Sequence, residues 1–147
     1  MAAIIPDNPP ASQRGASETG AAFKELTTPL VDSQMITRDP HDPIALQFLV
    51  DPRESRDVPG FHADPVGDLA ANAVPGVLHK YHGRALLVLT GACAVHCRYC
   101  FRRHFPYADQ RLDETALDRA LAYLAADPEM TEVILSGGDP LVLSSQR

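Results

Sequence analysis

The chain has 147 residues, of which 45% are hydrophobic and 22% are charged, values that are ordinary for a soluble globular protein. Its formal net charge of −6 gives no reason to expect binding to nucleic acid or to an anionic membrane. No apolar run approaches the roughly 20 residues that a transmembrane helix requires. The length allows one modest domain with its own hydrophobic core.

The first part of the chain is predicted to hold little regular structure. Residues 1–22 lack the apolar centre of a signal peptide, and we expect a disordered or weakly helical tail there. Residues 23–83 are predicted to form short helices and turns, a layer that packs onto something larger. Within this region Asp42-Pro43 is typical of a helix start, with Asp42 as the N-cap of a short helix that runs to Leu49.

The pattern changes at residue 84. Residues 85–89 are a continuous apolar run, which is typical of a strand buried on both faces of a parallel sheet. A helix is expected from Asp113, which can cap it, to about residue 126, and residues 132–136 are predicted to be a second buried strand. An apolar stripe at helical spacing supports the helix, and its members are Leu117, Ala120, Leu121 and Leu124.

Strand, helix and strand in this order make a βαβ unit, so the predicted fold class is α/β. A (β/α) barrel takes about 200 residues or more. We therefore interpret residues 84–147 as the start of a barrel that is incomplete in this chain, which looks like the front portion of a longer protein. The loops after both predicted strands leave at the carboxyl ends of those strands, where sites collect in α/β folds.

All three cysteines of the chain, Cys93, Cys97 and Cys100, lie within eight residues. So close a group with an odd count cannot staple a secreted fold, and it favours a metal site in a reducing compartment such as the cytoplasm. Thiolates are the usual ligands of iron–sulfur clusters, and three of them leave one iron of a four-iron cluster open for another ligand. The alternatives are a zinc site completed by His96 or His104, or three buried thiols without a metal.

Basic and aromatic side chains surround these cysteines. Tyr99 can place its ring near a bound ligand, and a run of cationic side chains comprises Arg98, Arg102, Arg103 and His104. Arg98 and Arg103 can equally form a solvated, solubilising cluster, which is the interpretation we favour for Arg103. The histidines at positions 79, 82, 96 and 104 are interpreted as ordinary polar loop residues, and none is assigned a catalytic role.

The three-cysteine loop after one strand, together with Ser136-Gly137-Gly138-Asp139 after the next, resembles the radical S-adenosylmethionine superfamily. The resemblance implies a partial (β/α)6 barrel with a [4Fe–4S] cluster on the three cysteines. It also implies that the open iron chelates the amino and carboxylate groups of S-adenosylmethionine, and that the turn at 136–139 lies against that amino group. Without the resemblance, Gly137-Gly138 is as readily a plain tight turn.

A longer stretch is more specific. Residues 75–81 (Pro-Gly-Val-Leu-His-Lys-Tyr), 84–87 (Arg-Ala-Leu-Leu) and 97–107 (Cys-Arg-Tyr-Cys-Phe-Arg-Arg-His-Phe-Pro-Tyr) are similar to the lysine 2,3-aminomutase family. The likeness is greatest to the branch that makes (R)-β-lysine for elongation factor P, and it covers roughly residues 40–147. It implies an isomerase in which a radical from S-adenosylmethionine takes a hydrogen from the β-carbon of lysine. Pyridoxal 5′-phosphate holds the lysine as an imine while the nitrogen moves from the α- to the β-carbon.

The same resemblance implies residue roles. Arg84, Tyr81 and Lys80 would face the pyridoxal phosphate, although Arg84 is otherwise an ordinary surface residue at a strand start. Arg102 would hold the substrate carboxylate, a task that suits the guanidinium fork. The family's lysine that anchors pyridoxal phosphate lies far downstream. Lys24 and Lys80 are the only lysines here and neither matches it, so no catalytic residue is assigned.

These implications define the expected behaviour and its rivals. We expect lysine as the small-molecule substrate, an electron donor for the cluster, and no turnover by these 147 residues alone. No nucleic-acid or membrane partner is expected, and a homo-oligomer is compatible with this interpretation. The rivals are another radical S-adenosylmethionine enzyme without pyridoxal phosphate, and a structural zinc-binding module.

Overall fold

The computed structural model describes residues 23–36, 39, 41–56 and 58–144, so the predicted tail at 1–22 lies outside the described residues. The chain forms two compact units. One unit comprises residues 1–61 with 94–103, and the other comprises residues 62–93 with 104–147. Among the described residues, none of the helices has the length and apolar character that crossing a membrane would require.

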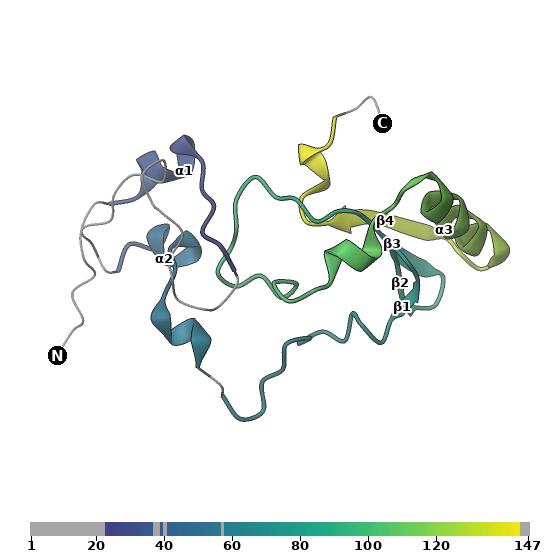
Figure 1. The fold of residues 1–147 in the computed structure, drawn as a ribbon, viewed down its shortest axis with the longest axis horizontal. Coiled ribbons are helices and arrows are strands. Elements are labelled where there is room, and N and C mark those ends of the chain that lie inside the picture. Colours follow the sequence, from purple (N-terminus) through teal and green to yellow (C-terminus); the bar gives the residue numbers. More distant parts are fainter. Residues whose placement is uncertain (1–22, 37–38, 40, 57, 145–147) are drawn as a thin grey trace. The chain divides into compact units, whose positions relative to one another are not determined.

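The second unit contains a four-stranded sheet in the order β1-β2-β3-β4 (Figure 1). Its strands are β1 (Asn72–Val74), β2 (Val77–Tyr81), β3 (Arg84–Thr90) and β4 (Glu132–Gly137). The first three strands pair antiparallel, whereas β4 runs parallel to β3. The α/β fold class is therefore confirmed, with a mixed sheet in place of a purely parallel one.

The hairpin of β1 and β2 corrects one expectation. The sequence predicted helices and turns up to residue 83, but residues 72–81 are two antiparallel strands. Pro75-Gly76 joins them as a two-residue turn. The two residues suit this turn because proline fixes its own φ and Gly76 takes a φ of 83°, which other residues rarely adopt. Val77 and Leu78 are buried, so the hairpin is held by the core beneath it.

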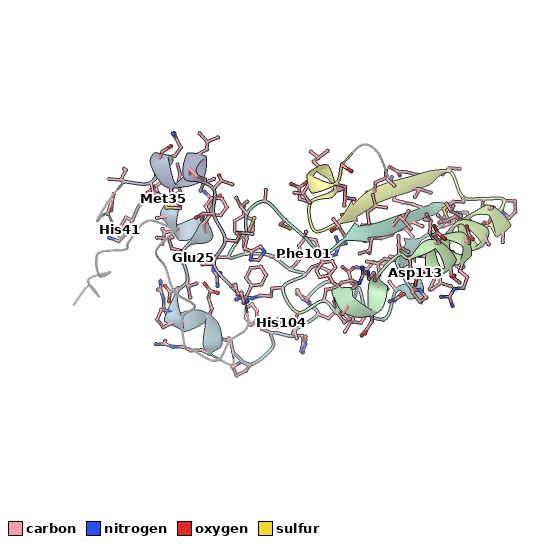
Figure 2. The ribbon with its side chains drawn as sticks, turned by 45° about the horizontal axis from the view of Figure 1, so that its top comes forward. Glu25, Met35, His41, Phe101, His104 and Asp113 are labelled. Atoms are coloured by element: carbon pink, nitrogen blue, oxygen red, sulfur yellow. The ribbon has the colours of Figure 1, made fainter. Side chains whose placement is uncertain are left out.

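The βαβ unit is confirmed. It consists of β3, the helix α3 (Glu114–Ala126) and β4, and the parallel register pairs Ala85 with Val133. Asp113 caps α3 as predicted, because its carboxylate accepts the backbone N–H of Ala116 at 2.8 Å. Figure 2 shows Asp113 where α3 begins.

The core of this unit lies between α3 and the sheet, and it is small. The predicted helix stripe is correct at Ala120 and Leu124 but wrong at Leu117 and Leu121, which are exposed. Ala116 is buried on α3 instead. The central cluster of buried side chains comprises Val77, Ala85, Leu87, Ala120 and Leu124.

Strand β4 also differs from expectation. The sequence predicted a strand buried on both faces, but Val133, Ile134 and Leu135 are 38–58% exposed. The reason is its place in the sheet, because β4 lies at an edge and pairs with β3 alone among the described strands. The continuous apolar run therefore marks a strand that the described chain covers only in part.

The first unit contains α1 (Pro29–Gln34), α2 (Ala45–Phe48) and the 3₁₀ turn η2 (Pro52–Ser55). The predicted helix start at Asp42 is wrong by a few residues, since α2 begins at Ala45 and Ile44 precedes it without a side-chain cap. Asp42 is buried, and its carboxylate accepts the N–H groups of Ile36 at 2.6 Å and Ile44 at 2.9 Å. It closes the turn before the helix.

Two further 3₁₀ turns belong to the second unit. They are η3 (Tyr107–Gln110), which precedes α3, and η4 (Pro140–Val142), which follows β4. Gln110 is buried, and its side-chain oxygen accepts the N–H of Gly76 at 2.8 Å. This bond fastens the segment before α3 to the β1–β2 turn.

Candidate metal centre

The three cysteines are divided between the two units. Cys93 belongs to the sheet unit, just beyond β3, whereas Cys97 and Cys100 belong to the other unit. Each is half-buried and none forms a disulfide. No group of three or more His, Cys, Asp or Glu side chains stands together as a ready metal site within the described part of the chain. The proposed ligand set therefore depends on the spacing of the thiols along the chain.

The glycine turn predicted from the sequence packs directly on the beginning of the cysteine loop. β4 ends at Gly137, and the Gly138 N–H donates to the Thr90 carbonyl at 2.7 Å. The Asp139 N–H donates to the Ala92 carbonyl at 2.8 Å. The backbone after β4 therefore continues to pair with the backbone after β3, up to the residue before Cys93.

Neither glycine of this turn leaves room for a side chain. A Cβ on Gly137 would lie 2.2 Å from the Thr90 oxygen, and the φ of Gly137 is 123°, which a side chain rarely tolerates. A Cβ on Gly138 would lie 2.3 Å from the Ala92 oxygen and 2.9 Å from the Cys93 Sγ. The backbone of the turn thus packs closely against Cys93, the first predicted ligand. A plain tight turn would not require this contact.

Neighbouring side chains hold the turn in place. The Tyr107 hydroxyl donates to the Gly137 carbonyl at 2.9 Å. The Asp139 carboxylate accepts the Leu141 N–H at 3.0 Å and so caps η4. Sequence reasoning did not assign Tyr107 a role, and nothing in its local sequence indicates that its hydroxyl reaches the end of β4.

The segment that carries Cys97 and Cys100 is fixed by one carboxylate. Arg98 Nε donates to Glu54 Oε1 at 2.8 Å, and Arg98 Nη2 pairs with Glu54 Oε2. Arg103 Nη2 donates to the same Oε2 at 2.8 Å. The side chains of Arg98, Glu54 and Arg103 are only 8%, 18% and 18% exposed. The interpretation of Arg103 as part of a solvated cluster is therefore wrong, and the same alternative fails for Arg98.

An aromatic ring lies beside both arginines. The guanidinium carbons of Arg98 and Arg103 are 5.3 Å and 4.8 Å from the centroid of the Phe23 ring, within the range of cation–π attraction. His96 stacks on Phe23 with the ring centroids 5.0 Å apart, and its Nδ1 lies 2.8 Å from the Lys24 carbonyl oxygen. His96 is thus held by tertiary contacts with residues 23 and 24.

Main-chain bonds add to this attachment. The Arg98 N–H donates to the Gln47 carbonyl at 2.7 Å, and the His96 N–H donates to the Leu26 carbonyl at 2.8 Å. The Cys100 N–H donates to the Cys97 carbonyl at 3.1 Å, which closes a turn between the two predicted ligands. These main-chain bonds, together with the Glu54 pairs, define the conformation of the segment.

The carboxylates of η2 are held ionised. Burial by itself would raise the pKa of Glu54, but hydrogen bonds from Arg98, Arg103 and the Asp51 N–H outweigh it and lower the pKa. The side chain of Arg53, and then its backbone N–H, lower the pKa of Asp51 from 3.8 to about 2. Glu54 accepts the Asp51 N–H in a capping box, so η2 itself presents Glu54 to the arginines.

Glu54 is the residue that sequence reasoning missed. It lies 44 residues before Arg98, and the pairing of the two is a tertiary contact without a local signal. The only available hint was the capping-box pattern Asp51-Pro52-Arg53-Glu54, which predicts a structured turn but does not identify its partner.

Tyr99 and Arg102 lie on the same segment. Tyr99 is exposed, and the charge of the nearby Cys97 thiolate, followed by a hydrogen bond between the two side chains, raises the pKa of the phenol. The guanidinium carbon of Arg102 is 4.9 Å from the centroid of the Phe101 ring. Tyr99 thus lies beside Cys97, and its contact with a bound ligand stays a prediction.

The residues predicted to face pyridoxal phosphate lie on the β2–β3 hairpin. Tyr81 and Arg84 are direct cross-strand partners, and both are exposed. Arg84 pairs with Glu132 on β4. Lys80 pairs with the buried Asp68 and donates to the Val66 carbonyl at 2.6 Å. The structure therefore brings Tyr81 and Arg84 together and engages Lys80 elsewhere.

Comparisons with known proteins agree with the predicted iron–sulfur site. A family profile described as a 4Fe-4S single cluster domain matches residues 81–147. The chain is 47% identical over 127 residues to the L-lysine 2,3-aminomutase of Escherichia coli, an alignment that covers 84% of this chain and 37% of that protein. It is 49% identical over 104 residues to the L-lysine 2,3-aminomutase of Haemophilus influenzae, covering 71% of this chain and 31% of that protein.

A more distant relative aligns over more of the chain. The L-lysine 2,3-aminomutase of Clostridium subterminale is 30% identical over 135 residues, which cover 91% of this chain and 32% of that protein. The chain thus spans about a third of the length of the curated relatives it matches.

Proposed function

We propose that this chain, which belongs to the lysine 2,3-aminomutase family of radical S-adenosylmethionine proteins, forms the part of such an enzyme that binds the [4Fe–4S] cluster and S-adenosylmethionine. The observation that carries the proposal is the packing of the glycine turn on Cys93, because it joins the two sequence elements assigned to these cofactors. The reaction of the whole enzyme would be the isomerisation of L-α-lysine to β-lysine.

The residues present fit an iron–sulfur cluster. Cys93, Cys97 and Cys100 offer three thiols without disulfides, which is the donor type such clusters use. The absence of a side chain at Gly138 lets the turn backbone pack against Cys93. When bound, the cluster would supply the electron that cleaves S-adenosylmethionine, with one iron left open for that ligand.

The protein's own part is to hold and orient. The three thiolates would hold the cluster, and the main chain at 136–139 would present polar groups to the amino end of S-adenosylmethionine, with the exposed ring of Tyr99 available to the same ligand. Burial of Arg98 and Arg103 against Glu54 keeps these two charges in fixed positions on the cysteine segment. Rigid placement is how a protein directs the chemistry of a cofactor.

The finer assignments are also proposals. Arg102 would bind the carboxylate of the lysine substrate. Arg84, Tyr81 and Lys80 would face pyridoxal phosphate, and the cross-strand pairing of Tyr81 with Arg84 supports a joint role for those two. The family resemblance also predicts that the β-lysine is attached to elongation factor P, and this stays a prediction. Three thiols within eight residues favour a reducing compartment such as the cytoplasm.

Anaerobic reconstitution with iron and sulfide tests the proposal. We expect a brown chain with about four irons, and loss of that iron when Cys97 is replaced by alanine. A colourless chain that binds one zinc would contradict the cluster and favour the zinc module. In a whole enzyme, absence of pyridoxal absorbance would favour a radical S-adenosylmethionine enzyme of another kind. We expect no turnover of lysine by these residues alone.

A further inference from the structure

We infer that Glu54 is a positioning residue for the cluster, which it serves by fixing the cysteine segment through Arg98 and Arg103 and by balancing their charge. This inference rests on the proposed function, since it assigns a role to Glu54 at the same site. Glu54 lies on η2, outside the three-cysteine loop, and its side chain is bonded to the two arginines and to the Asp51 N–H.

The geometry makes Glu54 the centre of the attachment. Arg98 lies between Cys97 and Cys100 in the chain, and both oxygens of Glu54 receive its guanidinium fork. Arg103, three residues after Cys100, reaches one of the same oxygens at 2.8 Å. Two residues that bracket Cys100 are thus tied to a single carboxylate by charge-assisted hydrogen bonds, which are the stronger kind.

The remaining contacts of the arginines cannot replace that carboxylate. Arg103 Nε is buried without a hydrogen-bond partner among the described residues, and Arg103 Nη1 reaches the Arg98 carbonyl only at 3.4 Å. Arg98 Nη1 donates to the Phe23 carbonyl at the same length. If Glu54 loses its charge, two largely buried guanidinium groups keep only the face of the Phe23 ring and two long hydrogen bonds. The segment that carries Cys97 and Cys100 then loosens.

The charge balance gives a second effect. One carboxylate faces two guanidinium groups, so this group of three side chains carries a net positive charge that Glu54 reduces. The reduction potential of an iron–sulfur cluster depends on nearby charge, because positive charge favours the more negative, reduced state. Removal of the Glu54 charge therefore raises the potential, whereas removal of the Arg103 charge lowers it.

These opposite signs separate a charge effect from general structural damage. The experiment compares the reconstituted chain with Glu54→Gln, Glu54→Asp and Arg103→Gln by redox titration followed by electron paramagnetic resonance. Iron release to an excess of a ferrous chelator is measured in parallel. Glu129→Gln is the matched control, because it removes the same charge from an exposed pair with His82 in the sheet unit.

We expect Glu54→Gln to shift the potential to a more positive value and to release iron about tenfold faster. Glu54→Asp restores the potential while iron release stays faster than in the unaltered chain, since the shorter side chain keeps the charge but not the fork. Arg103→Gln shifts the potential to a more negative value, and it replaces Glu54→Gln as the deciding variant if that chain does not fold. Glu129→Gln leaves both quantities unchanged.

The failures are distinguishable. An unaltered chain that takes up no cluster overturns the proposed function and this inference together. A cluster in the unaltered chain, combined with an unchanged potential and iron release in Glu54→Gln, overturns the inference alone. Shifts of the same sign in Glu54→Gln and Arg103→Gln also overturn it.

Discussion

Gly138 lies directly against Cys93, so close that a Cβ on the glycine would stand 2.9 Å from the cysteine Sγ. The contact joins two loops that leave the carboxyl ends of β3 and β4, strands that are parallel neighbours in the sheet. The βαβ unit thus does more than provide a core. It also places the turn after β4 next to Cys93, the first proposed metal ligand.

The first prediction follows from this contact. Gly138→Ala should lower iron uptake on anaerobic reconstitution to less than about half that of the unaltered chain, because the new methyl group displaces Ala92 and Cys93. Gly67→Ala is the control. Gly67 has a φ of 70° and nothing within 4 Å of its Cβ position, so that substitution strains the backbone without touching the loop. Equal iron uptake by both variants would show that the contact is unimportant for the cluster.

A second prediction concerns the stability of the folded chain at acidic pH. The pKa of Asp51 falls from 3.8 to about 2 on folding, so its ionised form stabilises the folded state fully above about pH 4. That contribution is lost as the pH falls through about 2. We expect Asp51→Asn to lower the thermal midpoint at about pH 5, and the difference from the unaltered chain to shrink between about pH 4 and pH 2. A difference that stays constant over this range would rule out Asp51 as the titrating group.

The parts of the fold that could be predicted have local signals. The helix α3 has its Asp113 cap and an apolar spacing, and the strands beside it are continuous apolar runs. The β1–β2 hairpin was missed because short strands acquire their character from pairing with β3, although Pro75-Gly76 between apolar residues is a turn signal. The burial of β4 was overestimated because the sequence does not state whether a strand lies at an edge.

The candidate site, like the fold, has parts that the sequence predicts and parts that it does not. The spacing of the cysteines and the glycines after β4 are visible along the chain. The role of Glu54 is not, because it depends on a contact across 44 residues with Arg98. From the sequence alone, arginines beside a metal motif suggest charges exposed to solvent. Only the tertiary structure shows that Arg98 and Arg103 are largely buried and paired with Glu54.

A third prediction tests the corrected core. Leu87→Ala should lower the free energy of unfolding by about 2–5 kcal/mol, because Leu87 is buried between α3 and the sheet. Leu121→Ala should change it by no more than about 0.5 kcal/mol, since Leu121 is exposed although the sequence pattern placed it on the buried stripe. Urea denaturation of both variants measures the difference. Equal losses would restore Leu121 to the core.

The fourth prediction compares two ion pairs of the hairpin region. Lys80 pairs with Asp68, whose side chain is only 3% exposed, whereas Arg84 and Glu132 are both about half exposed. Lys80→Met should therefore lower the free energy of unfolding by about 1–3 kcal/mol, because a buried carboxylate loses its cation. Glu132→Gln should cost less than about 1 kcal/mol, since water screens an exposed pair.

Salt provides the check on that comparison. Raising the ionic strength screens an exposed pair more than a buried one, so the small effect of Glu132→Gln should vanish in about 1 M salt while that of Lys80→Met persists. If Lys80→Met also becomes neutral in salt, its ammonium group stands in solvent and is available for another ligand. That result would strengthen the case for Lys80 as a phosphate contact, whereas a persistent loss assigns it to the support of the β2 strand.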